Sequence, residues 1–259
     1  MNAPSPGSLR LLPQALKQAL AQLELRALRL GRGPCPLCAG ALQLRFSFDP
    51  LGTRCLSCGA SAISMAIGSV LQQVAPDLAD RRVLELSSRG PLHAFLGRSV
   101  AGGSGSLSDC EYFDDLEPGE WRGGVQCQDV QRLTHADASF DLCTHTEVFE
   151  HVPDDARGFC EILRVLAPGG LMVFTAPLFE RPATLERARL EAGEIVHLES
   201  PSYHDDLIRG SGQVLVYRDY GLDLPQRIQD AGFGEARILR VADPAGFGCV
   251  HPVIVARKL

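Results

Sequence analysis

The chain has 259 residues, of which 45% are hydrophobic and 22% charged, enough for one full α/β domain and a small accessory module. No run of about 20 apolar residues is present and the N-terminus lacks a cleavable signal pattern, so we expect a cytoplasmic protein without a membrane segment. The net charge of −6 is uneven: residues 1–60 carry +5, which is weak evidence for a nucleic-acid contact, and the acidic remainder carries −11, which is poor evidence for one. We expect a small-molecule substrate and no nucleic-acid partner.

The first predicted element is an amphipathic helix. Leucine and alanine recur at steps of three and four between Leu9 and Leu30, and two glycines and a proline directly afterwards end the pattern. We therefore assign residues 1–30 to this helix. We favour a helix that packs on its own domain, and a homodimer formed through the helix is the alternative.

Four cysteines then form two close pairs. Two residues separate the members of each pair and 16 residues separate the pairs, which are Cys35 with Cys38 and Cys55 with Cys58. This spacing predicts a zinc-ribbon-like module at residues 31–60, because each pair can turn both sulfurs towards one metal ion. Four thiolates leave no open coordination position, so we expect a structural zinc; a redox pair is the disfavoured alternative. The other five cysteines are scattered, which indicates a reducing compartment.

A second helix, apolar on one face, is predicted within residues 61–80 and links the module to the rest of the chain. In residues 81–259 apolar strands alternate with helices. The expected strands are 83–86, 106–112, 124–127, 140–144, 171–176, 236–241 and 250–256, and the expected helices include 154–166 and 224–231. This alternation predicts the α/β class, with a Rossmann-like, doubly wound, mostly parallel sheet that ends in antiparallel strands.

Ligands of such sheets bind beyond the carboxyl ends of the strands, so the residues that follow each strand are the candidate site. In chain order they are Glu85, Leu86, Ser87, Ser88 and Gly90, then Glu111 and Tyr112, then Asp129 and Val130, and finally Thr144. A carboxylate at the Glu111 position can accept hydrogen bonds from both hydroxyls of a ribose, and an exposed loop carboxylate is the alternative. Asp129 could equally cap its own backbone.

The run FEHVPDD, which begins at Phe149, is followed from Glu161 by EILRVLAPGGLMVFTAP. These segments resemble the class I S-adenosylmethionine-dependent methyltransferases, and the resemblance spans about residues 81–180. It implies that the first turn approaches the cofactor, that Glu111 binds the ribose and that Asp129 accepts from the adenine amino group. The chain departs from the family at Ser87 and Arg89, where glycine is usual, and this departure puts the cofactor affinity in question.

Methyl transfer requires the protein to align donor and acceptor and, for oxygen or nitrogen acceptors, to remove a proton. His151 follows the fourth strand, and His204 lies within residues 178–221, a long insertion that we expect to be a lid or a substrate-recognition element. Both are candidate catalytic bases; a structural or substrate-positioning role is the alternative for each.

The sequence therefore predicts methyl transfer from S-adenosylmethionine to a small polar or carbohydrate-like acceptor. Two alternatives stay open. One is an RNA base methyltransferase that grips its substrate through the zinc module. The other is a methyltransferase-like binding or scaffold protein that has lost cofactor affinity through its glycine-poor first turn.

Overall fold

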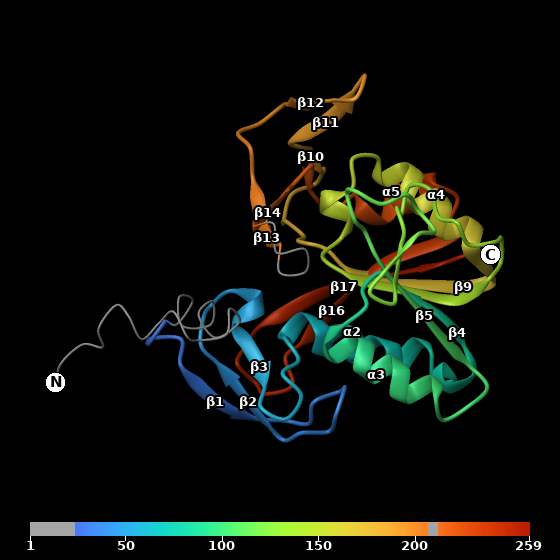
Figure 1. Ribbon diagram of the computed structural model, residues 1–259. Helices are drawn as coiled ribbons and strands as arrows, with labels where there is room; N and C mark the ends of the chain where they lie inside the picture. The colour runs from blue at the N-terminus through green and yellow to red at the C-terminus, as the bar shows by residue number, and fades with distance from the viewer. Residues whose placement is uncertain (1–23, 207–211) are drawn as a thin grey trace.

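The computed structural model describes residues 24–206 and 212–259, and its largest element is a sheet of eight strands (Figure 1). The strand order is β16-β17-β9-β8-β4-β5-β7-β6. In that order the strands span Glu235–Ala242, Val250–Arg257, Leu166–Thr175, Phe140–Thr146, Arg82–Glu85, Ser106–Glu111, Val125–Cys127 and Trp121–Arg122. The five strands from β9 to β7 are parallel, whereas β17 is antiparallel to both β9 and β16. The predicted mostly parallel sheet with a terminal antiparallel hairpin is confirmed.

Both faces of this sheet are buried, because successive side chains of each strand enter different cores. One core takes Val83, Leu142, Leu171, Val173 and Val253. The other takes their neighbours Leu84, Cys143, Met172, Phe174 and Ile254. Helices α2 (Ala62–Val74) and α3 (Gly90–Val100) cover the first face, and α4 (Asp155–Val165) and α5 (Leu224–Asp230) cover the second (Figure 1). The sheet is therefore doubly wound, as the alternation of elements predicts.

Local sequence signals set the ends of the helices. Ser61 and Asp154 accept hydrogen bonds from the backbone amides of Ser64 and Arg157, which caps α2 and α4. The helix expected within 61–80 ends at Val74, since the proline at position 76 disfavours helical backbone before it, and a 3₁₀ turn, η3 (Leu78–Asp80), follows. Strand β9 begins at Leu166, five residues earlier than expected, through an irregular register with β8.

The N-terminal module is a small antiparallel sheet of β1 (Arg29–Arg32), β2 (Leu42–Arg45) and β3 (Thr53–Cys55), with a 3₁₀ turn, η2 (Pro50–Gly52), before β3. The helix predicted for residues 1–30 lies mostly outside the described residues, and its last part is wrong. Residues 25–27 form a turn, and Leu30 lies in β1 opposite Leu44 of β2. Pairing with β2 satisfies the backbone groups here, and the glycines that follow make a helix costly, so the leucine spacing does not decide the structure.

The insertion between β9 and α5 is built from three short antiparallel pairs that extend away from the central sheet (Figure 1). The pairs are β10 (Leu185–Glu186) with β15 (Arg218–Asp219), β11 (Ala188–Glu191) with β12 (Glu194–His197), and β13 (Tyr203–Asp206) with β14 (Gly212–Leu215). Within the described part of the chain, no helix combines the length and apolarity that crossing a membrane requires.

Candidate functional site

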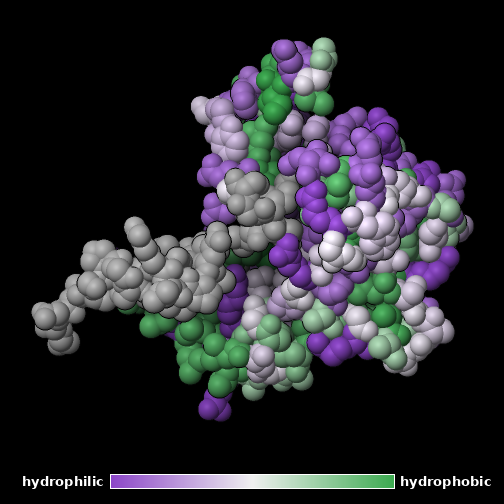
Figure 2. All heavy atoms as spheres, in the orientation of Figure 1, coloured by the Kyte–Doolittle hydropathy of each residue, from purple (hydrophilic) through white to green (hydrophobic). Residues whose placement is uncertain are grey.

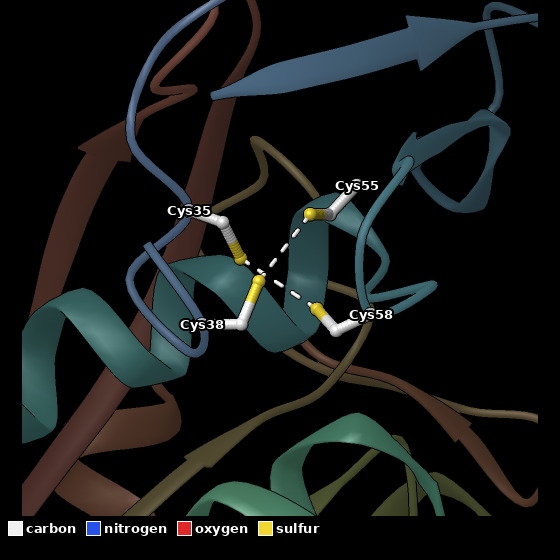
Figure 3. A group of neighbouring side chains, drawn as sticks. All are labelled: Cys35, Cys38, Cys55 and Cys58. Carbon is white, nitrogen blue, oxygen red and sulfur yellow. Dashed lines mark hydrogen bonds between the residues drawn. The ribbon is translucent and has the colours of Figure 1, made fainter. Parts of the chain in front are cut away.

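The four cysteines of the N-terminal module point their sulfurs at one another (Figure 3). The Sγ atoms of Cys35 and Cys58 are 3.8 Å apart, and those of Cys38 and Cys55 are 3.6 Å apart. Four sulfurs bound to one zinc ion at about 2.3 Å in a tetrahedron lie about 3.8 Å from one another. The donor set and its spacing therefore fit a tetrahedral thiolate centre.

Two similar turns produce this convergence. Each pair closes a turn in which the residue after the second cysteine has a positive φ: 60° at Ala39 and 76° at Gly59. In each turn the amide of that residue donates to the carbonyl of the first cysteine, Cys35 or Cys55. The buried side chains of the module continue into the core that α2 shares with the central sheet. The cysteine cluster therefore lies where the module joins the larger domain.

At the carboxyl edge of the central sheet, the first turn after β4 is tied to the end of β5. The backbone amide and the hydroxyl of Ser88 both donate to Oε1 of Glu111, each at 2.8 Å. Glu111 is only 8% exposed, so its carboxylate has little competition from water. Gly90 has a φ of +98° and open space where a Cβ would stand. The one glycine of this turn therefore occupies a conformation that other residues rarely adopt.

Glu85, at the end of β4, is almost completely buried, with 2% of its surface exposed. Burial, reinforced by the charges of Asp109 and Glu111, raises the pKa of Glu85 to about 9, so its carboxyl is protonated at neutral pH. Its Oε2 is 2.9 Å from Nδ1 of His93, which lies on α3. The sequence reasoning missed His93, although its place one turn into the helix after Gly90 was a usable signal.

The remaining predicted cofactor residues differ in their surroundings. The backbone of Leu86 donates to the carbonyl of Thr144, which joins the ends of β4 and β8, and the Thr144 side chain is fully buried. The side chain of Val130 packs into the core, whereas Tyr112 is about half exposed. The Asp129 side chain accepts from the backbone amide and from Nε2 of Gln131. This Asp therefore does cap its own turn.

The two predicted catalytic histidines lie together. Nδ1 of His204, on β13, is 3.2 Å from Nε2 of His151, at the end of the 3₁₀ turn η4 (Phe149–His151). The turn η4 follows β8, so both rings lie beyond the carboxyl edge of the sheet. A third group, Glu150, completes the cluster: its Oε1 is 3.6 Å from His151 Nε2 and 3.8 Å from His204 Nδ1. Burial and then the charge of Glu147 raise the pKa of Glu150 well above its ordinary value.

The return segment of the insertion holds this cluster in place. Arg218, 3% exposed, donates from Nη1 to the carbonyls of Phe149 and Val152 and from Nη2 to that of Pro153. The amide of Tyr217 also donates to the carbonyl of Glu150. These bonds fasten the insertion to the segment after β8, and so bring His204 to His151 across 53 positions of sequence. The sequence spacing alone could not predict this contact. For the same reason it did not identify Glu150 as a member of the cluster.

Residues 99–174 match the family Methyltransf_11, described as a methyltransferase domain. A ubiquinone biosynthesis O-methyltransferase of Coxiella burnetii is 40% identical over 50 residues, which is 19% of this chain and 21% of that protein. An uncharacterized methyltransferase of Mycobacterium sp. (strain KMS) is 46% identical over 50 residues, 19% of this chain and 20% of that protein. The chain thus matches about a fifth of the length of these curated relatives.

Two solved structures are similar to parts of this chain. An S-adenosylmethionine-dependent methyltransferase from Mesorhizobium loti has a TM-score of 0.48 at 15% identity, over 74% of this chain and 98% of that one. The 1,6-didemethyltoxoflavin-N1-methyltransferase of Burkholderia thailandensis, with bound S-adenosylhomocysteine, has a TM-score of 0.46 at 20% identity, over 76% and 78%. The stretch that matches the methyltransferase-domain family, residues 99–174, contains Glu111, Asp129 and the Glu150–His151 pair.

Proposed function

We propose that this chain transfers a methyl group from S-adenosylmethionine to a small polar or carbohydrate-like acceptor. The observation that carries the proposal is the carboxyl edge of the sheet, where Glu85 and Glu111 end neighbouring parallel strands, the second of them inside the matched methyltransferase domain. In open α/β sheets this edge is where nucleotide-like ligands bind. The bound cofactor supplies an electrophilic methyl group on its sulfonium, and the protein supplies alignment.

The contacts support the cofactor-binding roles that we propose for the pocket residues. The turn from Leu86 to Gly90 borders the cofactor, and Glu111 accepts from the ribose hydroxyls. Because both bonds from Ser88 go to Oε1 of Glu111, the carboxylate is held in one orientation before any ligand arrives. Asp129 stands at the adenine end, with its own turn rigidified by Gln131. Preorganised acceptors of this kind reduce the entropy lost when a ligand binds.

The proposed acceptor class rests on the insertion. The insertion that begins at the carboxyl end of β9 carries charged and polar side chains, among them His204 and the pair of Arg187 with Asp219, in which Nε and Oδ1 are 2.7 Å apart. Groups of this kind recognise hydroxyls and other polar substituents better than they recognise an apolar ligand. We assign residues 178–221 as the substrate-recognition element and the cysteine centre as a structural zinc site.

Two alternatives have a supporting observation each. An RNA base methyltransferase would use the exposed arginines of the N-terminal module, Arg26, Arg29 and Arg32, and its affinity for RNA would fall steeply with added salt. A scaffold protein would use exposed apolar side chains of the same module, such as Leu30 and Phe48; Figure 2 shows hydrophobic surface there, at the lower left. A protein of that kind would bind a partner stably without binding cofactor.

Calorimetric titration of the zinc-loaded protein with S-adenosylmethionine and S-adenosylhomocysteine tests the proposal. Glu111→Gln keeps an oxygen for Ser88 but replaces the other acceptor with an NH₂ donor. Loss of a hydrogen bond to a charged group costs about 1.5–3 kcal/mol, so we expect affinity to fall roughly 10- to 100-fold. Asp129→Asn, which keeps the acceptor for Gln131, should weaken binding in the same direction.

Glu235→Gln is the matched control. Glu235 lies opposite Arg257 in the register of β16 and β17, at the end of the sheet away from the carboxyl edge. Equal weakening by the control, or no binding of either ligand by the unmodified protein, would refute the assigned pocket. Absence of binding together with an intact cysteine centre would favour the scaffold alternative.

A further inference from the structure

In the cluster formed by Glu150, His151 and His204, the burial of Glu150 is not explained by the proposed reaction. The residue is 0% exposed, and neither carboxylate oxygen has a hydrogen-bond partner among the residues that the structure describes. A carboxyl group buried without a hydrogen-bond partner costs free energy in either protonation state unless another group compensates it. Its Oε1 faces two imidazole nitrogens at 3.6 and 3.8 Å, which is beyond the normal range of a hydrogen bond.

Those separations do suit three ligands of one metal ion. Nitrogen and oxygen donors about 2.0–2.2 Å from a tetrahedral ion lie about 3.3 Å apart. Here the nitrogen–nitrogen distance is 3.2 Å, and one ligand atom from each of Glu150, His151 and His204 lies within 4.8 Å of the other two. A small contraction around an ion would bring the carboxylate to the same spacing as the two rings.

The hydrogen bonding of His151 prepares it for this role. Its Nδ1 is 2.8 Å from the carbonyl oxygen of Leu215, which can only accept, so Nδ1 carries the proton. In the neutral ring this leaves the lone pair on Nε2, the atom that faces the cluster. Histidines that ligate metals usually donate their other N–H to a carbonyl or carboxylate in this way, because the bond sets the tautomer and orients the ring.

We infer that Glu150, His151 and His204 form a divalent-cation site that is separate from the cysteine centre. Two imidazoles and a carboxylate suit first-row ions such as zinc, and three protein ligands leave at least one coordination position for water or an oxygen of a bound molecule. The site joins the insertion to the segment after β8, since His204 comes from β13 and the other two ligands from η4. The inference depends on these side chains alone and not on methyl transfer.

Metal analysis after dialysis against buffered zinc tests the site directly. We expect two zinc ions per unmodified chain, and one per chain in His204→Ala and in Glu150→Gln, because the cysteine centre keeps its ion in both. In calorimetric titrations of protein that holds one zinc, each variant should bind the second ion at least about tenfold more weakly. His204 has a side chain 43% exposed, so its removal does not threaten the core.

His197→Ala is the matched control, since His197 is an exposed histidine of the same insertion, on β12. It should bind two zinc ions, as the unmodified chain does. Circular dichroism and the first zinc equivalent report whether each variant is folded. A single zinc in the unmodified chain, or two in both His204→Ala and Glu150→Gln, would overturn the inference.

Discussion

Replacement of Glu85 by glutamine tests the electrostatics at the end of β4. The carboxyl is protonated in the folded protein until about pH 9, whereas an unfolded chain releases this proton near pH 4.5. Between these two values the folded state binds the proton and the unfolded state does not, so the stabilisation present below pH 4.5 is lost progressively as the pH rises. Glutamine imitates the protonated carboxyl, keeps its size and can still hydrogen-bond to Nδ1 of His93.

The size of the effect follows from the two pKa values. In this range each pH unit changes the free energy of unfolding by about 1.4 kcal/mol for one such group. Between about pH 6 and pH 8 the unmodified protein should therefore lose roughly 3 kcal/mol relative to Glu85→Gln, since the residue is 2% exposed and poorly screened. Urea unfolding of both proteins, followed by circular dichroism with zinc held constant, measures this difference.

Comparing the two proteins cancels the contribution of every other titrating group. If their stabilities run parallel from pH 6 to pH 8, Glu85 is ionised in the folded state and the proposed protonation is wrong. A change in the denaturant slope between the proteins would instead indicate an altered unfolded or native state, and a second substitution, Glu85→Leu, would then separate burial from the hydrogen bond with His93.

Three further predictions concern packing and metal. Cys58→Ser, or chelation, should remove zinc and lower the unfolding temperature, because binding energy at a thiolate centre is folding energy; an unchanged melting curve after verified zinc loss would contradict a structural role. Leu71→Ala, at a fully buried position of α2, should lower the free energy of unfolding in urea by about 2–5 kcal/mol. A decrease below about 1 kcal/mol would show that the packing of α2 contributes little to the stability of the core. Arg218→Met removes a buried guanidinium that donates to three carbonyls, so it should cost about 3 kcal/mol and weaken the second zinc equivalent, with Arg189→Met, at an exposed position of β11, as the control.

Local patterns in the sequence were sufficient to predict the main architecture. Runs of apolar residues about the length of a strand, with helical periodicity between them, predicted β4, β5, β7, β8 and β9 and the terminal hairpin of β16 and β17, because burial on both faces requires apolar side chains at consecutive positions. The paired cysteines predicted one centre, since two residues between sulfurs is a geometric requirement for a shared ion.

The same patterns misled where tertiary pairing outweighed local preference. The leucine spacing up to Leu30 predicted a helix, yet the last residues of that segment form strand β1, which pairs with β2. Propensity differences of a few tenths of a kcal/mol per residue are smaller than the gain from a completed set of backbone hydrogen bonds.

The contact between His151 and His204 was decided only by the folded chain. Each residue was recognisable from the sequence as a polar group in a promising segment, but nothing in the spacing relates positions 53 residues apart or selects Glu150 as their companion. Their approach depends on Arg218, which is buried against three carbonyls of the segment after β8. Sequence periodicity reports which face of an element is buried, whereas the meeting of two side chains across an insertion depends on how that insertion packs.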